Sequence, residues 1–189
     1  MLSPQALRDH ETETDEMCQH AGKKGDNHGD PGDPPRRRAN KRRGHGTYEN
    51  DRPPIVGTGG RESGQCRLRV RKHTDGKAWQ KHVHGYTKKD TPCYTDEWQG
   101  YNRINRIHPT VWHGEKEWAR DDDGDGLREV HTNTIEGLGT TARNFLRPFR
   151  GVHKKYLPHY LAMGEHESNL KRISPKFIAQ LVARHKSVT

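Results

Sequence analysis

The sequence predicts an α/β layered domain, with strands first, then a strand–helix alternation, then helices. Apolar residues alternate with arginines between Cys66 and Val70, which is the two-residue period of a half-buried strand. Between Ile135 and Leu146 the apolar residues recur at spacings of three and four, which is typical of a helix. Only 28% of the residues are hydrophobic and 31% are charged, so the core is expected to be small.

The strand signals come early in the chain. A short strand is expected at Thr12–Cys18. Ile55–Gly57 and Cys66–Val70 flank a glycine-rich connection and predict a hairpin with one buried face and one basic face. Pro92–Asp96 is a candidate strand that ends on a carboxylate, and a further strand is expected at Thr110–Trp112.

Helix signals dominate the second half. Asn133 and Thr134 are both good N-caps, Pro148 is expected to end the helix that follows them, and Pro175 follows Ser174 as at a helix start. Four helices are predicted, over Lys77–His84, from Asn133 or Thr134 onward, over Tyr156–Leu170 and over Pro175–Ala183.

The chain divides into three parts by composition. Residues 1–53 are read as a polar N-terminal segment with a disordered basic arm, and the first 50 residues are expected to contribute little to the core. Residues 54–174 form the core, and residues 175–189 a C-terminal helix. Six of the eight residues 36–43 are basic, beginning with Arg36, Arg37 and Arg38, and we expect this run to contact DNA.

Charge and cysteine usage narrow the class of protein. Thirty-four Lys and Arg against 25 Asp and Glu leave a net charge of +9, which favours a polyanionic partner. No apolar run approaches the roughly 18 residues of a membrane-spanning helix, so nucleic acid is favoured over a membrane. Cys18, Cys66 and Cys93 form neither a disulfide framework nor a zinc ribbon. A cytoplasmic, nucleoid-associated location is therefore expected.

Three segments share one chemical feature. Each segment places a carboxylate at the end of a regular element, among polar or glycine neighbours that leave room for a ligand. The segments are Thr14–Glu16, Thr95–Tyr101 and His131–Gly137. The second reads Thr-Asp-Glu-Trp-Gln-Gly-Tyr, and the third begins His-Thr-Asn-Thr-Ile-Glu.

This arrangement resembles the DDE insertion-sequence transposases, a branch of the retroviral-integrase superfamily with a ribonuclease-H-like core. The resemblance runs from about Thr14 to Ser174. It implies a ribonuclease-H-like mixed sheet flanked by helices, with Asp15, Asp96 and Glu136 as catalytic residues and metal ligands. The family carries a DNA-recognition module ahead of its first aspartate; only 14 residues precede Asp15, so we expect a truncated copy, active or inactive.

The resemblance also implies a chemistry. Two Mg²⁺ or Mn²⁺ ions, hard cations that prefer carboxylate oxygens, stabilise the attacking and leaving oxygens of a phosphoryl displacement. A water cuts one DNA strand, and the 3′-hydroxyl that is left attacks target DNA. The implied partners are double-stranded DNA and further copies of the chain, as a dimer or larger transpososome. DNA contacts are expected from a basic surface after Glu136, formed by Arg143, Arg147, Arg150, Lys154 and Lys155.

Several alternatives stay open at this point. The chain could be a non-enzymatic basic DNA-binding remnant, or a structure-selective nuclease that cuts without joining. Asp121, Asp123 and Asp125 match part of a calcium loop, but Thr132 stands where a bidentate glutamate belongs, which favours a solvated acidic loop. Trp98 and Tyr101 are expected to pack in the core rather than stack on bases.

Overall fold

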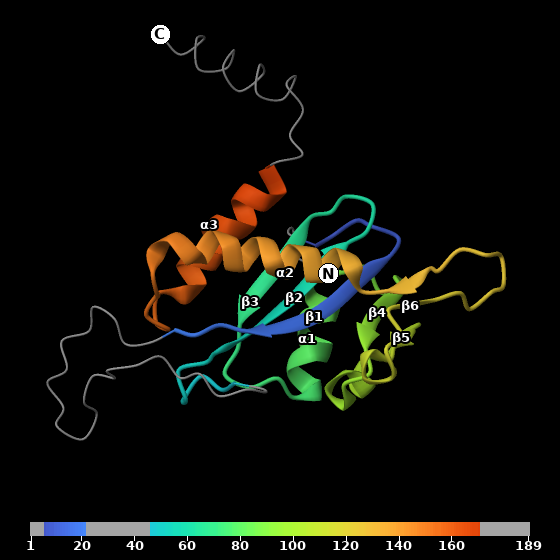
Figure 1. Ribbon diagram of the computed structural model, residues 1–189, viewed down its shortest axis with the longest axis horizontal. Coiled ribbons are helices and arrows are strands. Elements are labelled where there is room, and N and C mark those ends of the chain that lie inside the picture. The colour runs from blue at the N-terminus through green and yellow to red at the C-terminus, as the bar shows by residue number, and fades with distance from the viewer. Residues whose placement is uncertain (1–5, 22–45, 171–189) are drawn as a thin grey trace, which may run out of the picture.

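A five-stranded mixed sheet forms the centre of the protein (Figure 1). The computed structural model describes residues 6–21 and 46–170. The strands lie in the order β3-β2-β1-β4-β5, where β1 is antiparallel to β2, β2 antiparallel to β3, and β4 is parallel to both β1 and β5. Their bounds are Thr12–Cys18 for β1, Pro54–Gly60 for β2, Cys66–Val70 for β3, Cys93–Asp96 for β4 and Thr110–Val111 for β5.

Helices cover both faces of the sheet. On one face Val56 of β2 packs with Trp79 and Val83 of α1 (Gly76–Tyr86). On the other face Ile55 and Leu68 pack with residues of α2 (Asn133–Leu146) and α3 (Leu157–Leu170). Short elements complete the fold: the 3-10 helices η1 (Gln99–Arg103), η2 (His113–Glu115) and η3 (Arg147–Phe149), and a two-stranded sheet of β6 (Ala119–Arg120) and β7 (Val130–His131).

The predicted fold class, an α/β domain with a mixed sheet flanked by helices, is confirmed. The predicted hairpin is present as β2 and β3, and the strands and helices expected elsewhere in the described residues lie within a few residues of their predicted bounds. The small β6–β7 sheet was not predicted, because its strands are only two residues long. The helix expected at Pro175–Ala183 and the basic run at Arg36–Arg38 lie outside the described residues.

Glycines of β2 let α2 lie close to the sheet. A Cβ at Gly59 would come within 2.6 Å of the Leu138 side chain, and one at Gly57 within 3.2 Å of Ile135. Both contacts are shorter than is usual for a Cβ, so a side chain at either position would have to displace the end of the Leu138 or Ile135 side chain. The helix that carries Glu136 is therefore seated against the strand next to the one that carries Asp15.

The expectation that the first fifty residues contribute little to the core was wrong. β1 is the central strand of the sheet, and Leu7, Met17 and Ala21 are all buried. The strand lacks apolar residues before Met17 because its buried side chains are polar and bonded: the hydroxyls of Thr14 and Thr58 lie 2.8 Å apart. Paired polar groups can thus occupy the place of an apolar central strand.

Within residues 6–21 and 46–170, no helix combines the length and the apolar character that a membrane crossing requires.

Candidate active site

Asp15 and Asp96 come from neighbouring parallel strands. β1 and β4 pair Thr12 with Cys93 and Glu13 with Tyr94. The same offset, continued along the strands, places Asp15 opposite Asp96. Because side chains alternate across a strand, the two carboxylates lie on one face of the sheet, at the end where β4 stops.

Glu136 reaches the same place from the first turn of α2. A pocket of about 280 Å³ is lined by all three carboxylates, and Arg143 and His113 also contribute to its wall. The structure thus brings together three acidic residues that are remote in sequence and lie on β1, β4 and α2. Glu136 accepts a hydrogen bond from the Thr132 hydroxyl at 3.0 Å, and its carboxylate lies 3.3 Å from His113 Nε2.

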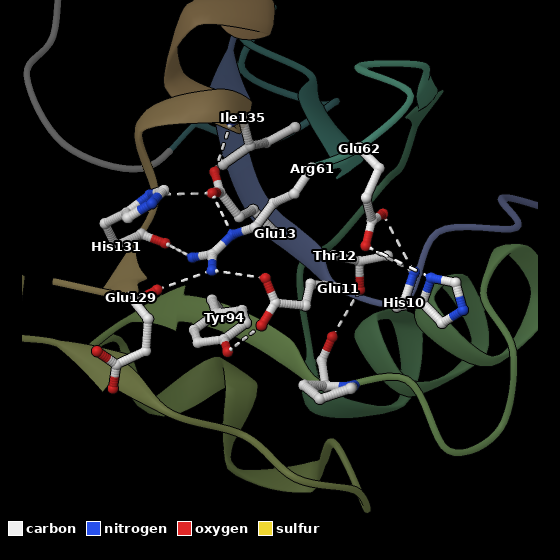
Figure 2. A network of polar contacts seen from close by, with 11 residues as sticks. His10, Glu11, Thr12, Glu13, Arg61, Glu62, Tyr94, Glu129, His131 and Ile135 are labelled. Atoms are coloured by element: carbon white, nitrogen blue, oxygen red, sulfur yellow. Dashed lines mark hydrogen bonds and ion pairs between the residues drawn. The ribbon is translucent and has the colours of Figure 1, made fainter. Parts of the chain in front are cut away.

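The start of α2 is fixed by a residue from β1. The helix begins after Thr132, and neither Asn133 nor Thr134 is its N-cap. Glu13, which is fully buried, accepts the backbone N–H of Ile135 at 2.9 Å (Figure 2). A carboxylate at this point satisfies a free N–H of the first turn and interacts favourably with the helix dipole. The cap therefore ties the helix of Glu136 to the strand of Asp15.

Negative charge is concentrated around Asp15. Burial raises the pKa of Asp15 to about 7, against the hydrogen bond that its Oδ1 accepts from the Glu16 N–H at 2.6 Å. The charges of Asp96, Glu16 and Glu136 raise the pKa further. Because Asp15 holds its proton to near neutral pH, its surroundings favour the addition of positive charge.

The raised pKa predicts how stability changes with pH. Between about pH 4 and pH 7 folded Asp15 holds its proton while the unfolded chain has lost it, so stability should fall as pH rises through this window. An asparagine at this position carries no charge, so in EDTA at pH 8 we expect Asp15→Asn to be more stable than the wild type by about 2 kcal/mol, after discounting for partial exposure. At pH 4 the two should melt together.

Thermal melts from pH 4 to pH 8 measure this difference, with Asp90→Asn, an exposed position, as the control. A gap between the Asp15→Asn and wild-type melting temperatures that stays constant over the whole pH range would contradict the prediction.

Two arginines border the acidic pocket. Arg143, two turns after Glu136 on α2, lines it. Arg52 joins Arg143 in an adjoining pocket of about 300 Å³ that also contacts Asp15 and Asp96. The site therefore combines carboxylates at its centre with guanidinium groups at its rim.

The remaining basic residues divide into two groups. Arg147, Arg150 and Lys155 are exposed after α2. Lys154 is instead held within the protein, because its Nζ lies 2.9 Å from buried Asp51 and donates to the Tyr48 carbonyl at 3.0 Å.

The residues around Asp96 stabilise its segment by packing and by hydrogen bonds. Tyr101 is buried against Trp79 and Trp98, so the predicted packing role is confirmed. The Trp98 N–H donates to Asp96 Oδ1 at 3.0 Å, and Glu97 accepts the N–H groups of His113 and Gly114, both at 2.9 Å. Glu97 thus fixes the turn that carries His113.

Several pocket and support residues were not predicted. His113 and Arg52 lie in segments without a motif, and only the fold brings them to the carboxylates. His131 Nδ1 lies 3.1 Å from Glu13, the residue that accepts the Ile135 N–H. No local signal marked Glu13, because nothing in the polar sequence around it indicates that its strand is buried.

The acidic loop between β6 and β7 contains a second cluster. Oxygens of Asp121, Asp123 and Glu129 lie within 4.8 Å of one another, a closeness that Asp15, Asp96 and Glu136 do not reach. Asp121 accepts the N–H groups of Gly124 at 2.6 Å and Gly126 at 2.9 Å, and these bonds lower its pKa. Glu129 likewise accepts the Asp122 N–H. Hydrogen bonds within the loop account for the cluster, in keeping with the solvated acidic loop that the sequence favours.

A mixed sheet with helices on both faces and three carboxylates in one pocket defines an α/β domain of the kind that the motifs indicated. The chain belongs to the family of ISXO2-like transposase domains, whose family model matches residues 28–169. The match includes Asp96 and Glu136 and begins after Asp15.

One relative comes from a transposable element. The chain is 29% identical over 153 residues to the "Uncharacterized protein in transposable element ISH50" of Halobacterium salinarum (strain ATCC 700922 / JCM 11081 / NRC-1). The similarity covers 79% of this chain and 49% of the relative, so the chain spans about half of that protein's length. Among solved structures, the catalytic core domain of BIV integrase is similar with a TM-score of 0.47 at 10% identity, over 96% of this chain and 99% of that one.

Proposed function

We propose that this domain is the catalytic part of a DNA transposase that cuts and joins DNA strands at Asp15, Asp96 and Glu136. One observation carries the proposal: carboxylates from three separate elements line a single pocket. Membership of a transposase-domain family and the transposable-element relative support the same function.

The pocket fits divalent Mg²⁺ or Mn²⁺ ions. Its three carboxylates offer the hard oxygen ligands that both ions prefer. Burial and then the neighbouring carboxylates raise the pKa of Asp15, and a cation would offset both effects. Asp15, Asp96 and Glu136 would hold the ions, after Glu136 releases the Thr132 hydroxyl. Two bound ions supply charge stabilisation for the attacking and leaving oxygens of a phosphoryl transfer.

The protein's own cations would orient the DNA. Arg143 and Arg52 stand at the rim, where a guanidinium can pair with a phosphate on either side of the scissile bond. Arg147, Arg150 and Lys155 extend this surface, and Arg36, Arg37 and Arg38 would add sequence-independent, salt-sensitive affinity. The partners we propose are double-stranded DNA and further copies of the chain, because two element ends must be processed together.

A strand-transfer assay tests the function. Duplex oligonucleotides with free 3′-hydroxyl ends, taken from the DNA that flanks the gene, are mixed with supercoiled plasmid and Mn²⁺. A transposase domain should join the oligonucleotide to the plasmid. Nicking without joining would instead indicate a nuclease. Binding of DNA with neither product would indicate a non-enzymatic DNA-binding protein, and both of these outcomes would contradict the proposal.

A further inference from the structure

We infer that Arg61 is a positioning residue, whose guanidinium sets the three carboxylate-bearing segments relative to one another. The inference rests on the proposed function, because it assigns a task to Arg61 at that same site. Arg61 follows the last residue of β2, and its side chain is only 10% exposed. It does not line the acidic pocket, so its effect must pass through other residues.

The first set of contacts joins Arg61 to β1. Its Nε donates to Glu13 at 2.8 Å, and one terminal nitrogen donates to Glu11 at 3.2 Å (Figure 2). Side chains two residues apart share a face of a strand, so Glu11, Glu13 and Asp15 form one row. The guanidinium therefore binds the row of side chains that leads along β1 to Asp15.

A second contact joins Arg61 to β4. The guanidinium carbon lies 3.7 Å from the centre of the Tyr94 ring, as in a cation–π pair. The Tyr94 hydroxyl donates to Glu11 at 2.9 Å, which closes a loop between the two strands. Tyr94 stands two residues before Asp96, on the same face of β4.

The third set reaches the segment that leads into α2. Arg61 donates to the backbone carbonyls of Glu129 at 2.7 Å and His131 at 2.8 Å. Its partner Glu13 also accepts the N–H of Ile135, the residue before Glu136. Figure 2 shows these bonds converging on Arg61 and Glu13 from both sides.

Arg61 makes hydrogen bonds of fixed direction to the groups around it. A buried ion pair is weak evidence for stability, because well-packed apolar residues often stabilise a protein as much. A planar guanidinium with five donors, in contrast, fixes the angles of every acceptor around it. Each of the three carboxylate-bearing segments contacts Arg61 or its partner Glu13 within two residues of its own carboxylate. The cluster is therefore placed to hold the geometry of the site.

Arg61→Lys tests this role. Lysine keeps the positive charge beside Glu13 but lacks the fork that bonds both carbonyls and faces Tyr94. We expect the dissociation constant for Mn²⁺, titrated by electron paramagnetic resonance, to rise about 10–100-fold, as for other groups that support metal ligands. Arg67→Lys, the same change on β3, is the matched control and should bind Mn²⁺ like the wild type. Circular dichroism establishes that each variant is folded at the titration temperature.

A milder variant covers the case in which Arg61→Lys fails to fold. Tyr94→Phe removes only the hydroxyl that bridges to Glu11, and should weaken Mn²⁺ binding several-fold in a folded protein. If the folded variant, Arg61→Lys or Tyr94→Phe, binds Mn²⁺ like the wild type while Asp96→Asn does not, the role of Arg61 is overturned. The proposed function then stays intact. If neither Asp96→Asn nor the Arg61 variant binds Mn²⁺ more weakly than the wild type, both the role of Arg61 and the proposed function are overturned.

Discussion

Asp96→Asn is expected to reduce Mn²⁺-dependent nicking and joining of DNA by about 10³-fold or more. Each factor of ten corresponds to about 1.4 kcal/mol of transition-state stabilisation, and loss of one of the three carboxylates proposed to hold the metal ions would remove several kcal/mol. The substitution is conservative for the fold, since the amide oxygen of asparagine can still accept the Trp98 N–H. DNA binding should be retained, because the basic rim is unchanged.

The measurement is the initial rate of plasmid nicking and of strand transfer at fixed Mn²⁺ concentration. Asp90→Asn removes one negative charge at an exposed position outside the pocket and serves as the control. A rate for Asp96→Asn within tenfold of the wild type would remove Asp96 from the catalytic site.

Glu13→Ala is expected to lower the free energy of unfolding by about 3–5 kcal/mol. Breaking this buried ion pair leaves Arg61 beside the partly exposed Glu11 without its closer, fully buried carboxylate, and the substitution also leaves the Ile135 N–H without its acceptor. For a domain of this size the loss corresponds to a fall in melting temperature of roughly 10 °C.

Glu62→Ala provides the comparison, because the Glu62 side chain is half exposed and accepts the backbone N–H of His10 at the surface. Exposed pairs contribute about 1 kcal/mol or less, so this variant should melt close to the wild type. Equal melting temperatures for Glu13→Ala and Glu62→Ala would show that the buried pair contributes no more than a surface contact.

Much of the local structure could be predicted from the residues. The alternation in Cys66–Val70 and the three-and-four spacing after Ile135 come from the geometry of a single strand and a single helix, so each is visible in a short window. The motif around Asp96 could be recognised for the same reason, as its residues are contiguous. Tyr101 was expected to pack in the core behind Asp96 rather than stack on bases, and it is buried there.

β1 shows where such prediction stops. Its polar residues gave no apolar signal, yet Glu13 is among the most buried residues of the protein. Its partners are Arg61, 48 residues later, and the Ile135 N–H, 122 residues later. The burial of a charged group depends on partners that no local window contains. The start of α2 was predicted correctly, but its N-cap was assigned to Asn133 or Thr134, and the first-turn N–H of Ile135 is bound by Glu13 from another element.

By itself, the sequence determined the class of the fold and the order of its elements, because these follow from periodicity. The resemblance of its motifs to a transposase family implied the three carboxylates worth testing. Only the tertiary structure decided that Asp15 lies opposite Asp96, that Arg52 and His113 join them, and that Lys154 turns inward to Asp51. Strand register and helix packing bring distant residues within contact distance, and these distances are a property of the folded chain rather than of any segment.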